Sequence, residues 1–158
     1  MARELDILMP NLTTILGKIY GRPHDYWRVG TKLGGKESIW DLMKEEACIA
    51  VGWSEVPDLR EFSYNREDKE AIKKIVAEKY PSSSQSVGRS AHQLFAFATT
   101  IQEGDYVIPS DGEKVLGVGQ IIGDYYFAGA NRAPHRRPVK WLGFFEWKTP
   151  EKEGLRTT

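Results

Sequence analysis

The feature that most constrains the fold is the close spacing of the extended segments in the second half of the chain. Residues 106–108 and 115–122 have the apolar pattern of strands, and Asp111-Gly112 between them is a typical hairpin turn. A further strand is expected over 138–147. Parallel strands need long crossover connections, and these segments leave no room for them. The second half therefore predicts a mainly antiparallel, curled sheet.

Apolar spacing in the rest of the chain predicts several helices and two more strands. Strands are expected over 26–30 and 47–53, and helices over 12–19, 37–46, 66–80 and 87–101. This order favours an α+β fold, a small curled mixed β-barrel flanked by helices.

The 158 residues fit one domain with a core of its own. Three parts are expected along it: an N-terminal helical extension over 1–23, the main domain over 24–148, and a polar tail or the start of a linker over 149–158.

Charge and cysteine content limit the expected partners and compartment. The 22 basic and 22 acidic residues cancel, so any basic surface must be local. Cys48 lies in an apolar run and is expected to be a buried thiol, and one cysteine forms no disulfide framework. The sequence has neither a signal peptide nor an apolar run of the roughly 18 residues that a membrane span needs. We expect a cytoplasmic protein with no membrane partner.

One motif resembles a phosphate-binding loop. Residues 30–36, Gly-Thr-Lys-Leu-Gly-Gly-Lys, fit the pattern G-x-x-x-x-G-K between a strand and a helix. The next residue is Glu37, where a hydroxyl should face magnesium, and a carboxylate there would repel the phosphates. We interpret the motif as a glycine-rich turn. With the three histidines far apart and Cys48 without an electropositive setting, we expect no catalytic or metal site, no cofactor and no enzymatic activity.

Aromatic residues gather at two places where strands end. Trp53 follows a strand and precedes the polar turn that starts at Ser54, and Tyr125, Tyr126 and Phe127 lie between Gly123 and Gly129. Rings at strand ends are well placed to offer their faces to a ligand. Core packing is the alternative for Trp53, and at least one of the three adjacent rings must pack inward because neighbouring strand residues point to opposite faces.

Basic residues follow the second aromatic group. Between residues 125 and 145 there is no acidic residue, whereas the stretch contains four arginines or lysines and a histidine: Arg132, His135, Arg136, Arg137 and Lys140. Basic side chains interleaved with aromatic ones suit a phosphate backbone that carries exposed bases. Arg89, at the expected start of a helix, would give another phosphate contact. The alternative is a solvated loop with surface salt bridges.

Five segments together carry a family resemblance. They are Tyr26-Trp27-Arg28-Val29-Gly30, Cys48-Ile49-Ala50-Val51-Gly52-Trp53, Gly104-Asp105-Tyr106-Val107, Val115-Leu116-Gly117-Val118-Gly119-Gln120-Ile121 and His135-Arg136-Arg137-Pro138-Val139-Lys140-Trp141. Their order and spacing resemble EVE-like domains of the PUA-like superfamily, relatives of the YTH domains. Over about residues 24–147 the chain is similar to the N-terminal DNA-binding domains of archaeal McrB-type restriction proteins, which precede a GTP-hydrolysing AAA+ motor.

The resemblance implies a site that holds a base flipped out of nucleic acid, with N6-methyladenine favoured. Trp53 and Ser54 would form one wall of an aromatic cage, and Tyr125, Tyr126 and Phe127 the other. Trp141 would also contact the base, and Thr31 and Lys32 would bind its edge. The expected function is a DNA-binding specificity module that reads a methylated base for a modification-dependent restriction system, with an AAA+ motor and a nuclease as partners. A YTH-like reader of methylated RNA and a PUA-like domain for a small molecule or a protein are the alternatives.

Overall fold

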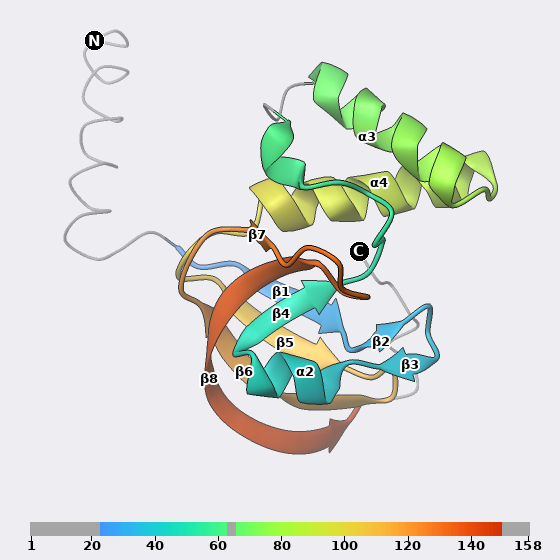
Figure 1. The fold of residues 1–158 in the computed structure, drawn as a ribbon. Helices are drawn as coiled ribbons and strands as arrows, with labels where there is room; N and C mark the ends of the chain where they lie inside the picture. Colours follow the sequence, from blue (N-terminus) through green and yellow to red (C-terminus); the bar gives the residue numbers. More distant parts are fainter. Residues whose placement is uncertain (1–22, 63–65, 150–158) are drawn as a thin grey trace, which may run out of the picture.

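The computed structural model describes residues 23–62 and 66–149. Its elements, in chain order, are β1 (Tyr26–Gly30), β2 (Lys32–Leu33), β3 (Glu37–Ser38), α2 (Trp40–Glu45), β4 (Cys48–Val51), the 3-10 helix η1 (Leu59–Glu61), α3 (Arg66–Lys79), α4 (Ser84–Thr99), β5 (Tyr106–Ser110), β6 (Lys114–Ile121), β7 (Tyr126–Phe127) and β8 (His135–Lys148). A curled sheet is flanked by helices, which confirms the α+β class (Figure 1).

The main sheet has the strand order β1-β5-β6-β8-β4, and β7 also pairs with β8. Only β1 and β5 pair in parallel, and the remaining described pairs are antiparallel. The predicted hairpin joins β5 to β6. The side chain of Asp111 accepts hydrogen bonds from the backbone N–H groups of Glu113 and Lys114 at 2.9 and 2.8 Å. These bonds order the turn, and the mainly antiparallel prediction is confirmed.

Strand β8 gives the sheet its curl. The pairing of β6 with β8 shifts register twice, between Val115 and Gly117 and between Val118 and Gly119, and such bulges bend a strand. A Cβ atom at Gly119 would lie 2.5 Å from Val139 Cγ1, so the close approach of the two strands requires glycine there. Figure 1 shows the result, because β8 sweeps around the sheet in a wide arc.

The two long helices lie together along one side of the sheet (Figure 1). Helix α3 occupies nearly the predicted range, and α4 begins at Ser84, three residues before the predicted start. The Oγ atom of Ser83 accepts the N–H of Ser86 at 3.2 Å, so a serine caps α4 earlier than its apolar periodicity begins. Their buried side chains join the core of the sheet at Ile72, Val76 and Leu94.

The first half of the chain differs from the prediction around the glycine-rich turn. Residues 37–38 pair with residues 32–33 as a short hairpin, and the helix predicted over 37–46 begins only at Trp40. Gly34 and Gly35 have φ angles of 56° and 73°, which let the chain reverse direction between the two strands. The predicted 12–19 helix, the rest of the 1–22 segment and residues 150–158 of the tail lie outside the described residues.

Candidate functional site

Trp53 has the most unusual backbone conformation at the ligand-binding positions that the sequence predicts. It follows β4 with a φ of 56°, in the left-handed region that bulky residues rarely adopt. Its carbonyl oxygen accepts the N–H of Val56 at 2.8 Å and lies 3.2 Å from Nε2 of His135. A conformation of this kind costs about 1–3 kcal/mol and persists where the surroundings hold it. Trp53 is half-buried and packs against the hydrophobic core, and Ser54 in the following turn is exposed.

The hairpin of β2 and β3 lies next to this corner of the sheet. A Cβ atom at Gly52 would lie 3.2 Å from Leu33 Cδ2 and 3.9 Å from the carbonyl oxygen of Arg132. The guanidinium of Arg132 forms an ion pair with the Glu37 carboxylate. Segments from β2, β3, the end of β4 and the residues before β8 therefore meet at one place.

The two residues predicted to bind a base edge have different surroundings. Thr31 is buried, and its backbone N–H and its hydroxyl both bond to the carbonyl oxygen of Ser110, at 2.9 and 3.3 Å. The prediction for Thr31 is therefore corrected, because its polar groups join the ends of β1 and β5 instead. Lys32 is exposed on the hairpin, and its charge helps to lower the pKa of Asp111, whereas its neighbour Leu33 faces Gly52.

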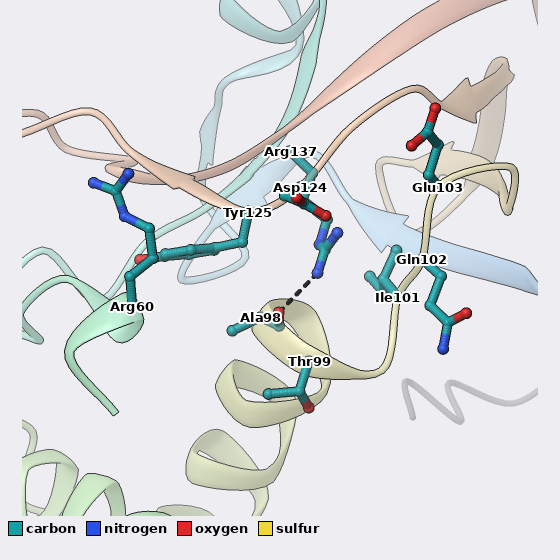
Figure 2. A pocket seen from close by; sticks show the side chains of 9 residues that line it. All are labelled: Arg60, Ala98, Thr99, Ile101, Gln102, Glu103, Asp124, Tyr125 and Arg137. Carbon is teal, nitrogen blue, oxygen red and sulfur yellow. Dashed lines mark hydrogen bonds between the residues drawn. The ribbon is translucent and has the colours of Figure 1, made fainter. Parts of the chain in front are cut away.

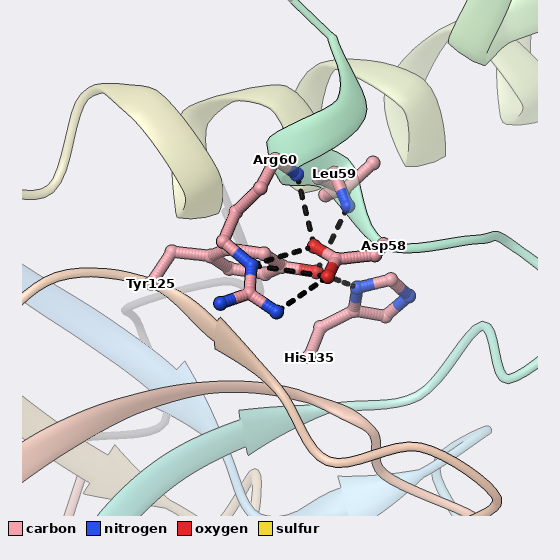
Figure 3. A network of polar contacts seen from close by, with 5 residues as sticks. All are labelled: Asp58, Leu59, Arg60, Tyr125 and His135. Atoms are coloured by element: carbon pink, nitrogen blue, oxygen red, sulfur yellow. Dashed lines mark hydrogen bonds and ion pairs between the residues drawn. The ribbon is translucent and has the colours of Figure 1, made fainter.

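A buried polar network contains Tyr125 and His135 (Figure 3), and His135 connects it to the carbonyl oxygen of Trp53. The hydroxyl of Tyr125 lies 2.7 Å from His135 Nδ1 and accepts the N–H of Leu59 at 3.2 Å. Because the carbonyl of Trp53 is only an acceptor, Nε2 of His135 carries the proton and Nδ1 accepts the one that Tyr125 donates. Burial lowers the pKa of His135, so the neutral ring that this chain of bonds requires is favoured.

Tyr125 and His135 were predicted to contact a base and a phosphate, and the structure buries both. Their side chains bond to each other and to the backbone around Trp53 and Leu59. Both side chains therefore support the backbone of Trp53 and Leu59 from the protein interior.

Arg136 and Arg137 are also corrected, since they are only 5% and 3% exposed. Arg137 donates to the carbonyl oxygens of Phe97 and Ala98, both at 2.7 Å, and thereby caps the C-terminal end of α4. Arg136 donates to the carbonyl of Ala133 at 3.0 Å. The physical reason is that β8 begins at His135, three residues before the predicted start, and this places both arginines inside the sheet between β4 and β7.

The expected second aromatic wall does not form opposite Trp53. Tyr126 lies on β7 opposite Arg136, where burial raises its pKa and its hydroxyl bonds to Cys48. The indole of Trp141 donates to the carbonyl of Met43 at 3.1 Å and packs against α2. Cys48 is buried as predicted, and burial raises its pKa. Trp53, Tyr126 and Trp141 are each half-buried against the core, and among them Trp53 is the one that follows Gly52 beside the β2–β3 hairpin.

The remaining predicted phosphate contacts are dispersed. Arg132 is exposed beside the hairpin, Arg89 is exposed on α4, and Lys140 is exposed on β8 opposite Gln120. Of these three, Arg132 alone has contacts that link it to the Trp53 corner.

A cavity of about 790 Å³, which the sequence did not predict, lies between η1, the end of α4 and the turn before β7 (Figure 2). Its lining residues are Arg60, Ala98, Thr99, Ile101, Gln102, Glu103, Asp124, Tyr125 and Arg137. Arg137 points into this region but already donates to backbone carbonyls, and two carboxylates lie at the rim. The cavity therefore has little net attraction for a phosphate, although Tyr125 links it to the network below Trp53.

Two classes of site find no support among residues 23–62 and 66–149. They contain no group of three histidine, cysteine or acidic side chains arranged to hold a metal ion. No helix in this part is both long enough and apolar enough to cross a membrane.

The fold and this corner define the chain as an α+β domain with a curled sheet and an aromatic residue held in the left-handed conformation at a strand end. The family model described as "Domain of unknown function (DUF8426)" matches residues 27–153, and the chain belongs to that family. No curated protein matches the sequence.

Proposed function

We propose that this chain is a nucleic-acid-binding module that reads one methylated DNA base, N6-methyladenine by preference, on the face of Trp53. The observation that carries the proposal is the half-buried Trp53 at the end of β4, whose backbone is held in a strained conformation by Val56 and His135. Backbone strain of this kind clusters at functional sites. The similarity of the chain to N-terminal domains of McrB-type restriction proteins supports the same function in a modification-dependent restriction system.

Each part of the corner has a role in this proposal. The indole stacks on the base, and Leu33 offers an apolar neighbour across Gly52. Arg132 contacts a flanking phosphate. The ion pair between Arg132 and Glu37 is exposed and therefore weak, so a phosphate would replace the carboxylate at small cost.

The energetics favour a base that is already weakly paired. Stacking on one ring yields about 1–3 kcal/mol, whereas flipping a base out of a duplex costs a few kcal/mol. A buried methyl group adds about 0.8 kcal/mol, which corresponds to about fourfold in affinity. With one aromatic wall in place of two, the expected preference for the methylated base is modest.

Fluorescence anisotropy with labelled oligonucleotides at low salt tests the proposal. The panel is a duplex with one N6-methyladenine, the same duplex unmodified, and the matching RNA. We expect a several-fold preference for the methylated duplex, and Trp53→Ala should weaken binding by about tenfold or more. Tyr26→Ala is the control, because Tyr26 is an exposed ring at the start of β1, whereas the β2–β3 hairpin follows the end of that strand.

Three results would count against the proposal. Failure to bind any of the three oligonucleotides would exclude the nucleic-acid function, and equal loss in Trp53→Ala and Tyr26→Ala would exclude Trp53 as the contact. Tighter binding of the RNA would favour the RNA-reading alternative.

A further inference from the structure

The outer half of β8 carries a patch of exposed apolar side chains that the proposed function does not use. Leu142, Phe144, Phe145 and Trp147 are 49%, 57%, 47% and 64% exposed. Adjacent strand residues such as Phe144 and Phe145 point to opposite faces, so both faces of this half of the strand are apolar, and an exposed apolar edge strand is prone to pair with another chain. Phe144 also packs against Trp40 and Trp141, with ring centroids 5.8 and 5.9 Å apart, so the patch continues onto the first turn of α2.

The same half of β8 has an unpaired edge. Strand β4 pairs with β8 only from His135 to Pro138, and the last backbone bond on that side joins the N–H of Val139 to the carbonyl of Ala47 at 2.8 Å. Strand β6 occupies the other edge as far as Lys148. In Figure 1 this part of β8 is the outermost arc of the sheet. Within the described ranges, its free N–H and C=O groups are a template for another strand.

The charges along this edge favour a second copy of the chain as the partner. In an antiparallel pair of two β8 strands centred on Gly143, Lys140 lies opposite Glu146 twice, and Leu142 lies opposite Phe144 twice. Centring the pair on Phe144 would place Lys140 opposite Lys148, and like charges at opposed positions are destabilising. Of these two registers, the sequence of β8 favours the one centred on Gly143.

Two structural details agree with this register. Lys140 pairs with Gln120, and Glu146 bonds to Lys114 at 2.7 Å, so both charges lie on the less buried face of β6. No atom lies within 4 Å of the position that a Cβ at Gly143 would occupy. A side chain introduced at position 143 therefore meets no other atom of the chain.

We propose that this chain forms a symmetric homodimer through the outer half of β8, paired antiparallel about Gly143. A two-fold axis makes the interface self-complementary, so each contact between the two copies occurs twice. The dimer stands independently of the nucleic-acid function, because it uses neither Trp53 nor the β2–β3 hairpin.

Sedimentation equilibrium of the full chain over a range of concentrations tests the dimer. Lys140→Glu should raise the dissociation constant of the dimer by about tenfold or more, because the new carboxylate would lie opposite Glu146 at two symmetric places in the dimer. Adding Glu146→Lys to Lys140→Glu should restore the constant to within about threefold of the original, with all variants made in a Lys114→Ala background because Lys114 forms an ion pair with Glu146. Lys73→Glu on α3 is the matched control and should have no effect, and circular dichroism checks that each variant is folded.

A cross-link reports the register directly. Gly143→Cys places two thiols opposite each other at the axis, so oxidation should yield a covalent dimer, whereas Lys73→Cys should yield none; Cys48 is buried and does not compete. A chain that remains monomeric at every concentration would overturn the proposal. So would a dimer that ignores Lys140→Glu, is not restored by the double exchange, or does not cross-link at Gly143.

Discussion

Removing a single oxygen atom, in Tyr125→Phe, should destabilise the protein strongly. The hydroxyl of Tyr125 joins the backbone N–H of Leu59 to Nδ1 of His135 at 3.2 and 2.7 Å, and both partners are buried. Phenylalanine keeps the ring, which lies 6.5 Å from Phe97 and 5.9 Å from His135. The change therefore leaves two buried polar groups without their partner and leaves the packing intact.

Each buried polar group that loses its hydrogen bond costs about 1–3 kcal/mol, so Tyr125→Phe should lower the free energy of unfolding by about 2–6 kcal/mol. Urea denaturation measures it, and the midpoint should fall by about 1 M or more at an unchanged slope. Tyr80→Phe is the matched control. The hydroxyl of Tyr80 accepts only the exposed N–H of Glu55, at 3.0 Å, and its loss should cost about 1 kcal/mol or less.

The same variant tests whether the network controls Trp53. With 5-fluorotryptophan incorporated, the ¹⁹F resonance of Trp53, assigned with Trp53→Phe, should shift or broaden in Tyr125→Phe, while the other four tryptophans change little. A loss of stability below about 0.5 kcal/mol would refute the account of the buried network. An unchanged Trp53 resonance in a destabilised protein would show that the network does not set the position of the indole.

Three further predictions follow from buried or crowded groups. Burial lowers the pKa of His135, so just below the ordinary histidine pKa of about 6.5 the unfolded chain binds more protons than the folded one. The contribution of His135 to stability should be complete above that pH and should fall as the pH decreases below it. Urea denaturation at a series of pH values should show a weaker fall in His135→Gln. Arg137→Ala should cost about 3–5 kcal/mol in urea denaturation, because Phe97 and Ala98 at the end of α4 lose the donors of their carbonyls. Gly119→Ala should lower the free energy of unfolding by about 1–3 kcal/mol, because its Cβ would lie 2.5 Å from Val139. Gly129→Ala is the comparison: its Cβ meets nothing within 4 Å, so it measures the cost of a positive φ without crowding.

Periodicity and turn chemistry were enough to predict most of the fold. The hairpin at Asp111-Gly112 and the helix of residues 66–79 follow from local signals, and both are confirmed. The start of the first helix after β1 was wrong because residues 37–38 pair with a segment that the sequence marked as a turn. Propensity over a few residues does not include the partner strand.

The candidate site was harder to predict, because its outcome depends on contacts between distant residues. The local sequence around Arg137 predicts a basic phosphate-binding surface. The side chain of Arg137 bonds instead to the carbonyl oxygen of Phe97, 40 residues earlier in the chain. The network of Tyr125 and His135 depends in the same way on Trp53 and Leu59. Trp53 was identified from its place at a strand end, whereas its left-handed conformation had no local signal.

The parallel pairing of β1 with β5 sets an order of events during synthesis of the chain. The N–H of Asp25 bonds to the side chain of Asp105, 80 residues later, and Tyr26 pairs with Tyr106. At about 5–20 residues per second, a ribosome needs roughly 4–16 s to make the intervening segment. Throughout that interval β1 lacks its neighbour, whereas α3 and α4 form from local contacts. The first strand to be made is therefore among the last to join its sheet, and closing this long loop is expected to limit how fast the domain folds.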